Sequence, residues 1–221
     1  MTEKTRGLVL SYIKYKETSI ICKIFTESFG IQSYIINGIR NSKSKNIGLF
    51  QPLNILDLVV YHKKSSDLHR IKETKLQYLY KTMHLDIKKI SMCFFLSEFL
   101  SKVLSNEENQ NEKFEFILNS LIFLDSLSKG YSNFHIQFLI KFARLCGFEI
   151  TKSNQLTDLG TAENDLKKYV DSCIKNNYDI KINSNNILRN KVINLLLKYF
   201  SENLDIRISL NSANVLKEIF K

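Results

Sequence analysis

The sequence predicts an α+β protein in which a small, closed, five-stranded β structure precedes a mostly α-helical part. Three observations lead to this prediction. Short runs of β-branched and aromatic residues, separated by Gly, Pro and polar turns, fill roughly the first 75 residues. Beyond residue 82, apolar residues recur every three or four positions, which is the helical spacing. The charge changes at the same place: residues 1–81 carry a net +8 and residues 82–221 a net +2.

The strands of the first part are marked by breakers between them. Gly30 and Gly38 flank the third apolar run, and Pro52 marks the re-entry after a polar, basic loop at 40–48. Strands are expected at 5–14, 18–27, 31–37, 53–62 and 68–75. Five short strands in so few residues are typical of a small barrel.

The helices of the second part are predicted by apolar stripes, which indicate a shared core. Gly147 is a typical helix stop. Helices are expected at 86–104, 111–127, 133–146, 187–200 and 211–220, with a weaker one around 163–175. The expected domains are therefore 1–81, the β part, and 82–221, the helical part.

Composition excludes several classes of protein. A chain of 221 residues with 44% hydrophobic and 24% charged residues has enough apolar surface for a folded core. The cysteines are too far apart for a CxxC pair, so we expect free thiols in a reducing compartment. They are Cys22, Cys93, Cys146 and Cys173. No apolar run approaches the ~20 residues of a membrane span, and the N-terminus lacks a signal-peptide core. We expect a soluble, cytoplasmic protein.

Catalytic motifs are not found. The four histidines, His62, His69, His84 and His135, have no metal-binding spacing, and no phosphate loop or nucleophile elbow is present. The carboxylates of the basic first part are scattered singly, whereas a magnesium nuclease needs them clustered. We therefore expect no active site, no metal and no cofactor.

The positive charge is the stronger signal. A net charge of +10 favours a polyanionic partner, either nucleic acid or an anionic membrane. The expected phosphate contacts lie in the first strand, in the turns after the first and fourth strands, in the basic loop and on the fifth strand. They are Arg6, Lys14, Lys16, Arg40, Lys43, Lys45, Lys63, Lys64, Arg70 and Lys72. Tyr12, Tyr34 and Tyr61 are candidates for base stacking.

Several short motifs occur in order along the first 75 residues. They are Gly7-Leu8-Val9-Leu10, Tyr15-x-Glu17-Thr18-Ser19, Phe25-Thr26 with Gly30, Gly38-x-Arg40 and Gln51-Pro52-Leu53. With these motifs, the first 75 residues resemble the start of the RecO family of bacterial DNA-repair proteins. The helical part matches more loosely, through Leu145-Cys146-Gly147-Phe148 and a closing VLKEIF helix.

The resemblance implies an N-terminal OB-fold followed by a helical domain. It also implies a non-enzymatic protein, cytoplasmic and nucleoid-associated, that binds single- and double-stranded DNA and anneals complementary strands. With RecR, such proteins help RecA displace single-strand binding protein. Many members carry a four-cysteine zinc module in the helical domain. The matching stretch of this chain, 146–175, holds only Cys146 and Cys173, so no zinc is expected.

A partner site is expected on the helix at 133–147. RecO-like proteins bind the acidic, apolar tail of single-strand binding protein, which needs an apolar groove and a cation. Phe138 and Phe142 could supply the groove, and Lys141 and Arg144 the charge.

Two alternatives use the same basic surface. One is a nucleic-acid-processing enzyme such as a nuclease. The other is an RNA-binding or peripheral membrane adaptor.

Overall fold

A computed structural model describes residues 2–41, 46–63, 65–108, 110–156 and 164–220 of the chain. These residues form two compact units that do not follow the sequence order. The barrel unit contains residues 1–79 and 96–115, and the helical unit contains residues 80–95 and 116–221. Because neither unit is one continuous segment, the expected boundary between residues 81 and 82 stays a prediction.

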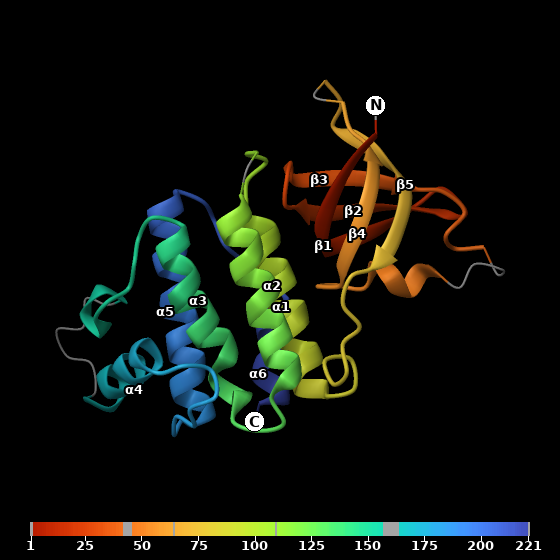
Figure 1. The fold of residues 1–221 in the computed structure, drawn as a ribbon. Helices are drawn as coiled ribbons and strands as arrows, with labels where there is room; N and C mark the ends of the chain where they lie inside the picture. The colour runs from red at the N-terminus through yellow and green to blue at the C-terminus, as the bar shows by residue number, and fades with distance from the viewer. Residues whose placement is uncertain (1, 42–45, 64, 109, 157–163, 221) are drawn as a thin grey trace. The chain divides into compact units, whose positions relative to one another are not determined.

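A closed five-stranded barrel forms the barrel unit's main body (Figure 1). Its strands are β1 (Thr2–Tyr15), β2 (Ser19–Thr26), β3 (Gly30–Ile36), β4 (Ile55–Tyr61) and β5 (Leu68–Leu76). The strand order is β1-β2-β3-β5-β4, with β3 and β5 parallel and every other pair antiparallel. This is a five-stranded OB-fold barrel.

Strand β1 closes the barrel because it is long enough to pair on both sides. Residues 2–8 pair with β4, and residues 7–15 pair with β2. The register shifts between Val9 and Ser11, the mark of a β-bulge, which bends the strand around the barrel. The interior is apolar: Val9, Ile24 and Val60 are fully buried there.

Residues 96–115 complete the barrel unit by packing on β2 and β3. The amide of Ile31 donates to the carbonyl of Ser105 (3.2 Å), and the rings of Phe25 and Phe114 lie 5.8 Å apart. Gly30 is required at this contact. Its φ is +63°, and a Cβ there would lie 2.4 Å from the backbone oxygen of Glu107.

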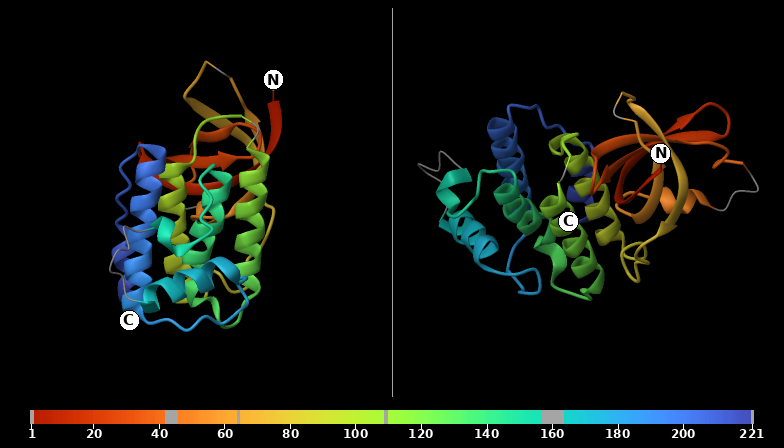
Figure 2. Two further views of the ribbon diagram at one scale, coloured as in Figure 1. Left: turned by 90° about the vertical axis from the view of Figure 1, so that its left-hand side faces the viewer. Right: turned by 45° about the horizontal axis from the view of Figure 1, so that its top comes forward.

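Six α-helices lie in the described part of the chain. They are α1 (Ile87–Val103), α2 (Asn111–Ser126), α3 (Phe134–Leu145), α4 (Asn164–Lys175), α5 (Asn186–Leu204) and α6 (Ser212–Ile219). Three short 3-10 helices are η1 (Asn46–Phe50), η2 (Tyr131–Asn133) and η3 (Ser153–Leu156). Figures 1 and 2 show α3 and α5 side by side, and α4 packs beside both.

Aromatic rings fill the core of the helical unit. Phe138 and Phe142 of α3 are fully buried, with their centroids 5.8 Å apart. Phe138 also packs on Phe116 of α2, and Phe142 stacks on Phe200 of α5. The apolar stripes recognised in the sequence are therefore the shared core of these helices.

A buried polar cluster fixes the start of the helical unit. The Asp125 carboxylate accepts from the amides of Lys81, Thr82 and Met83 (2.8–2.9 Å) and from the Thr82 hydroxyl (3.1 Å). Lys89 is 1% exposed, and its Nζ donates to Thr82 Oγ1 and to the carbonyls of Asp125 and residue 127. All of these hydrogen bonds except the one from Lys89 to Thr82 join segments that are distant in sequence.

The predicted fold class is confirmed. Each expected strand and helix is present, with ends that differ by at most four residues. The largest difference among the strands is at β1, which begins at Thr2 rather than residue 5 because its N-terminal end pairs with β4. At its other end β1 continues to Tyr15, so Lys14, expected in a turn, lies within the strand.

Candidate nucleic-acid interface

One row of outward-facing side chains crosses all five strands of the barrel. Ile13 of β1 pairs with Ile21 of β2, Ile21 with Ile35 of β3, and Ile35 with Arg70 of β5. Arg70 in turn pairs with Tyr61 of β4. Ile13 is 64% exposed and Tyr61 47% exposed, so apolar surface and a guanidinium face the solvent together.

The neighbouring row carries a second cation. It runs from Ser11 through Lys23 and Ser33 to Leu68, which is 40% exposed. Side chains alternate between the two faces of a strand. Because Cys22 lies in the barrel interior, its neighbours Ile21 and Lys23 point outward. We call the two rows from Ile13 to Tyr61 and from Ser11 to Leu68 the outer face.

The loops beside the outer face add positive charge. Lys16 lies in the β1–β2 turn with φ +49°, and its backbone oxygen accepts from Arg40 Nη1 (3.3 Å). The Arg40 amide also donates to the carbonyl of Thr18 (2.9 Å), so two segments distant in sequence hold their cations together. Lys63 is exposed in the β4–β5 loop. These two loops flank the ligand-binding face of OB-folds.

Lys23 is the cation of the outer face that sequence reasoning missed. Its Nζ donates to the carbonyl of Ser101 (2.9 Å). Burial, together with the nearby charge of Lys102, lowers the pKa of Lys23. The alternation of β2, with an outward position between two buried ones, is the signal that would have placed Lys23 on the surface.

The expected phosphate contacts fall into three groups. Six are described as exposed or half-buried side chains of the barrel: Lys14, Lys16, Arg40, Lys63, Arg70 and Lys72. Lys72 is 3.6 Å from the carboxylate of Glu73, and both side chains are well exposed. Lys43, Lys45 and Lys64 lie outside the described residues. Arg6 forms the third group.

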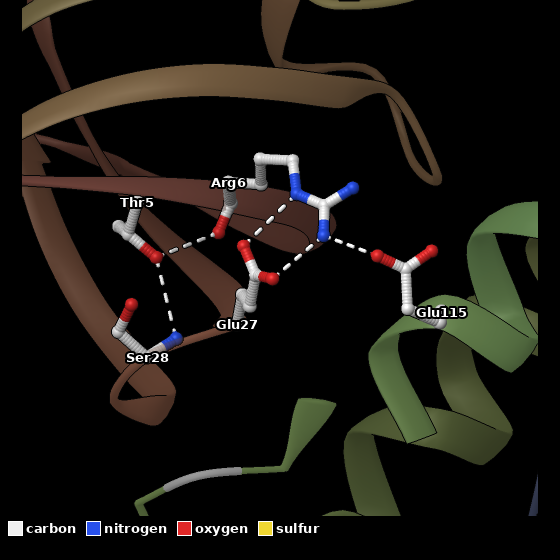
Figure 3. A network of polar contacts seen from close by, with 5 residues as sticks. All are labelled: Thr5, Arg6, Glu27, Ser28 and Glu115. Atoms are coloured by element: carbon white, nitrogen blue, oxygen red, sulfur yellow. Dashed lines mark hydrogen bonds and ion pairs between the residues drawn. The ribbon is translucent and has the colours of Figure 1, made fainter. Parts of the chain in front are cut away.

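Arg6 is held by two carboxylates (Figure 3). Its Nε and Nη2 bind both oxygens of Glu27 at 2.9 and 2.6 Å, and Nη2 also binds Glu115 of α2. The hydrogen bond to Arg6 lowers the pKa of Glu27. Thr5 supports the arrangement by accepting the Ser28 amide. Two carboxylates neutralise this guanidinium, so the structure gives Arg6 an ion-pairing role and offers no support for a phosphate contact.

The three tyrosines proposed for base stacking differ in how exposed their rings are. Tyr61 is 47% exposed and Tyr12 is 38% exposed, so both rings are open to solvent. Tyr34 is fully buried in the barrel interior, and its hydroxyl has no hydrogen-bond partner among the described residues. The expectation that Tyr34 stacks on bases is therefore not met, because strand β3 turns this ring inward.

The four residues of α3 that are expected to bind a partner also differ in exposure. Phe138 and Phe142 belong to the helical core and form no open groove. Lys141 lies over the ring of Tyr178, with its Nζ 4.4 Å from the ring centre, and burial lowers its pKa. Arg144 is exposed. Partner binding at this helix stays a prediction, and the two cations are its remaining basis.

Two further observations concern metal sites and membrane spans. No three His, Cys, Asp or Glu side chains come together as a metal site within the described ranges. No helix in the described part of the chain is long and apolar enough to cross a membrane.

Comparison with known proteins agrees with the fold. Residues 1–80 match the family model "Recombination protein O N terminal", and residues 84–156 match "Recombination protein O C terminal". A curated relative from Flavobacterium psychrophilum, "DNA repair protein RecO", is 32% identical over the full length of both chains. This chain belongs to the RecO family.

Other RecO-family relatives agree. The DNA repair protein RecO of Flavobacterium johnsoniae is 30% identical, again over all of both chains. That of Phocaeicola vulgatus is 37% identical over 66% of this chain and 61% of the relative. The resemblance recognised in the sequence is confirmed, and the chain is a RecO-family DNA repair protein.

Proposed function

We propose that this protein binds single- and double-stranded DNA with the outer face of its barrel and anneals complementary strands. It acts without catalysing a chemical step. With RecR, it helps load RecA onto DNA coated by single-strand binding protein. The observation that carries this proposal is the outer face itself, where exposed apolar side chains and cations share adjacent rows.

The chemistry of the outer face suits a single strand. The cations Lys16, Lys63 and Arg70 can contact phosphates without reading sequence, and the exposed ring of Tyr61 can stack on a base of any kind. Weak, sequence-independent contacts of this kind suit a protein that must bring two strands together and then release them.

The first experiment measures the salt dependence of DNA binding. Replacing Lys16, Lys63 and Arg70 together by Ala removes three expected phosphate contacts. The slope of log affinity against log salt should fall in magnitude by about 2 for single strands, at about 0.7 per contact. A matched control removes the same charge from exposed lysines of the helical unit. These are Lys129, Lys152 and Lys168. A slope that changes equally in both triple variants would refute the assignment to the barrel.

The second experiment distinguishes annealing from the alternatives. Complementary strands, naked or coated by the cognate single-strand binding protein, are mixed with the protein, and duplex formation is followed by fluorescence. The protein should accelerate both reactions and leave strand length unchanged when magnesium is present. Cleavage of the strands would favour a nuclease, and tighter binding to RNA or anionic vesicles at the same salt would favour an adaptor.

A protein partner on the helical unit is part of the proposal. The tail of single-strand binding protein would use Lys141 and Arg144 of α3 as its cations. The Lys141→Glu, Arg144→Glu double variant should anneal naked strands at the normal rate and lose annealing only on coated strands. Equal rates on coated strands for the variant and the native protein would place the partner elsewhere.

A further inference from the structure

A hollow of about 620 Å³ adjoins the outer face of the barrel. Lys23 and Ser33 of the outer face belong to its wall, which also includes Phe29, the β4–β5 loop and the turn that follows α1. All of these residues belong to the barrel unit. A volume of this size is within the ~300–1,000 Å³ of small-molecule sites.

Stacked rings make one wall of the hollow rigid. The ring of His62 lies between Phe29, at a centroid distance of 4.1 Å, and His69, at 4.7 Å. His69 Nε2 is 2.8 Å from Gln32 Oε1, and the side-chain nitrogen of Gln32, Nε2, donates to the carbonyl of Phe29. The wall is therefore held by hydrogen bonds as well as by stacking, and it is preformed.

The polar groups of the wall suit an uncharged ligand with hydrogen-bonding edges. His62 Nδ1 is buried and has no hydrogen-bond partner among the described residues, which costs free energy while it remains unpaired. Ser33 contributes a hydroxyl group that can donate or accept, and the Ser66 hydroxyl, which donates to the Leu68 carbonyl (2.9 Å), can still accept. Burial, and then the neighbouring His62, lower the pKa of His69, so this ring is neutral at neutral pH.

The charges of the wall do not favour an anion. Lys23 and Lys63 are matched by Asp67 and Glu108, and the Lys23 ammonium is already bound to a backbone carbonyl. The phosphates of a bound strand are better placed along the outer face, beside Arg70. The part of a nucleotide that suits the hollow is its base.

We propose that this hollow receives one unstacked base of a single strand bound on the outer face. The inference rests on the proposed DNA binding and adds a site to it. Ile31 and Phe29 give the base an apolar wall, and the His62 ring, the Ser33 hydroxyl and the Ser66 oxygen meet its polar edge. A base held there is withdrawn from stacking with its neighbours in the strand.

The test fills the hollow and compares two oligomers. Ser33→Phe places a ring in the hollow, and Ser11→Phe places the same ring across β2 from it, where Ser11 pairs with Lys23 but does not line the hollow. Affinity is measured for a thymidine oligomer and for a base-free deoxyribose-phosphate oligomer of equal length. Ser33→Phe should weaken thymidine-oligomer binding about tenfold more than base-free binding, the size of one base contact, and should leave both salt slopes unchanged because no charge is removed. Ser11→Phe should preserve the difference between the oligomers.

The outcomes separate the two proposals. If the native protein binds neither oligomer, the proposed DNA binding fails. If Ser33→Phe weakens both oligomers equally or neither, DNA binding stands and the base site fails. Should circular dichroism show that Ser33→Phe is unfolded, the nitrogen resonances of the His62 ring in the native protein decide. They should shift on addition of the thymidine oligomer and not of the base-free one, and equal shifts with both overturn the proposal.

Discussion

The carboxylate of Asp125 should be among the most important polar groups for stability in the helical unit. Its side chain is 1% exposed and accepts three backbone amides and one hydroxyl. In Asp125→Asn the amide nitrogen must replace either Oδ1, which accepts three of these donors, or Oδ2, which accepts the Lys81 amide. In either orientation at least one buried N–H faces another N–H.

The magnitude follows from counting what is lost. A hydrogen bond to a charged group contributes about 1.5–3 kcal/mol, and a buried donor left unpaired costs about 1–3 kcal/mol. Asp125→Asn also removes a negative charge near the buried ammonium of Lys89, whose charge it helps to compensate. Removing one partner of a buried charged pair costs about 3–5 kcal/mol. We expect Asp125→Asn to lower the free energy of unfolding by about 3 kcal/mol.

The assay is urea denaturation followed by circular dichroism at pH 7 and at lower pH. Burial opposes ionisation of Asp125, but its hydrogen bonds with the backbone amides and the Thr82 hydroxyl outweigh burial and lower its pKa. The carboxylate therefore stabilises the fold above the unfolded-state pKa, near 3.8, and this stability is lost as the pH falls through the folded-state pKa. The loss of stability in Asp125→Asn should be largest at pH 7 and should shrink below pH 4.

A matched substitution gives the control. Asp171→Asn changes a carboxylate that accepts one described amide, that of Ser153. It should lower the free energy of unfolding by about 1 kcal/mol or less. The reasoning is refuted if Asp125→Asn costs no more than Asp171→Asn, or if its cost is independent of pH.

Three further predictions test the packing of both units. Gly30→Ala should lower the free energy of unfolding by more than about 2 kcal/mol, because φ is +63° and a backbone oxygen occupies the place of the new Cβ. In the same urea titration, Gly48→Ala should change this free energy little, because its Cβ would meet nothing within 4 Å. Tyr34→Phe should leave the thermal midpoint unchanged or raise it, because it removes a buried hydroxyl without a partner among the described residues; Tyr178→Phe, which loses a bond to a serine hydroxyl, should lower it. Burial, and then a nearby arginine, lower the pKa of His135 to about 3. The free energy of unfolding should therefore fall as the pH drops from about 6.5 toward 3, because the unfolded chain binds a proton that the folded ring does not. His135→Phe should reduce the slope of this free energy against pH by up to about 1.4 kcal/mol per pH unit.

Periodicity was enough to place the strands and helices, because each element buries one face against a core that its own sequence specifies. The bulge between Val9 and Ser11 shows where periodicity alone is insufficient. Leu8 and Leu10 share a parity with Arg6 and Tyr12, but the bulge shifts the alternation midway along β1. After the bulge, Tyr12 pairs with Cys22 of the barrel interior, and the outward positions are Ser11 and Ile13.

The candidate site was predictable as a charged surface and not as a geometry. Lys16 and Arg40 were expected to be cations of the same surface, but the contact between their loops depends on the tertiary structure. The sequence did not distinguish Arg6 from the other basic residues, because its carboxylate partners Glu27 and Glu115 are brought to it only by the fold. The hollow next to Ser33 is lined by residues from four separate segments, so no local pattern in the sequence could predict it.

The participation of residues 96–115 in the barrel unit restricts how the chain can be divided. A gene fragment that ends near residue 81 would encode all five strands but would leave the Ile31 amide without its carbonyl acceptor and the Phe25 ring without Phe114. Residues 80–95 are, in effect, an insertion within the barrel unit. Exchange of this barrel between proteins by a single crossover would therefore yield an incomplete barrel unit, and a transplantable version must carry residues 96–115 on a linker of its own.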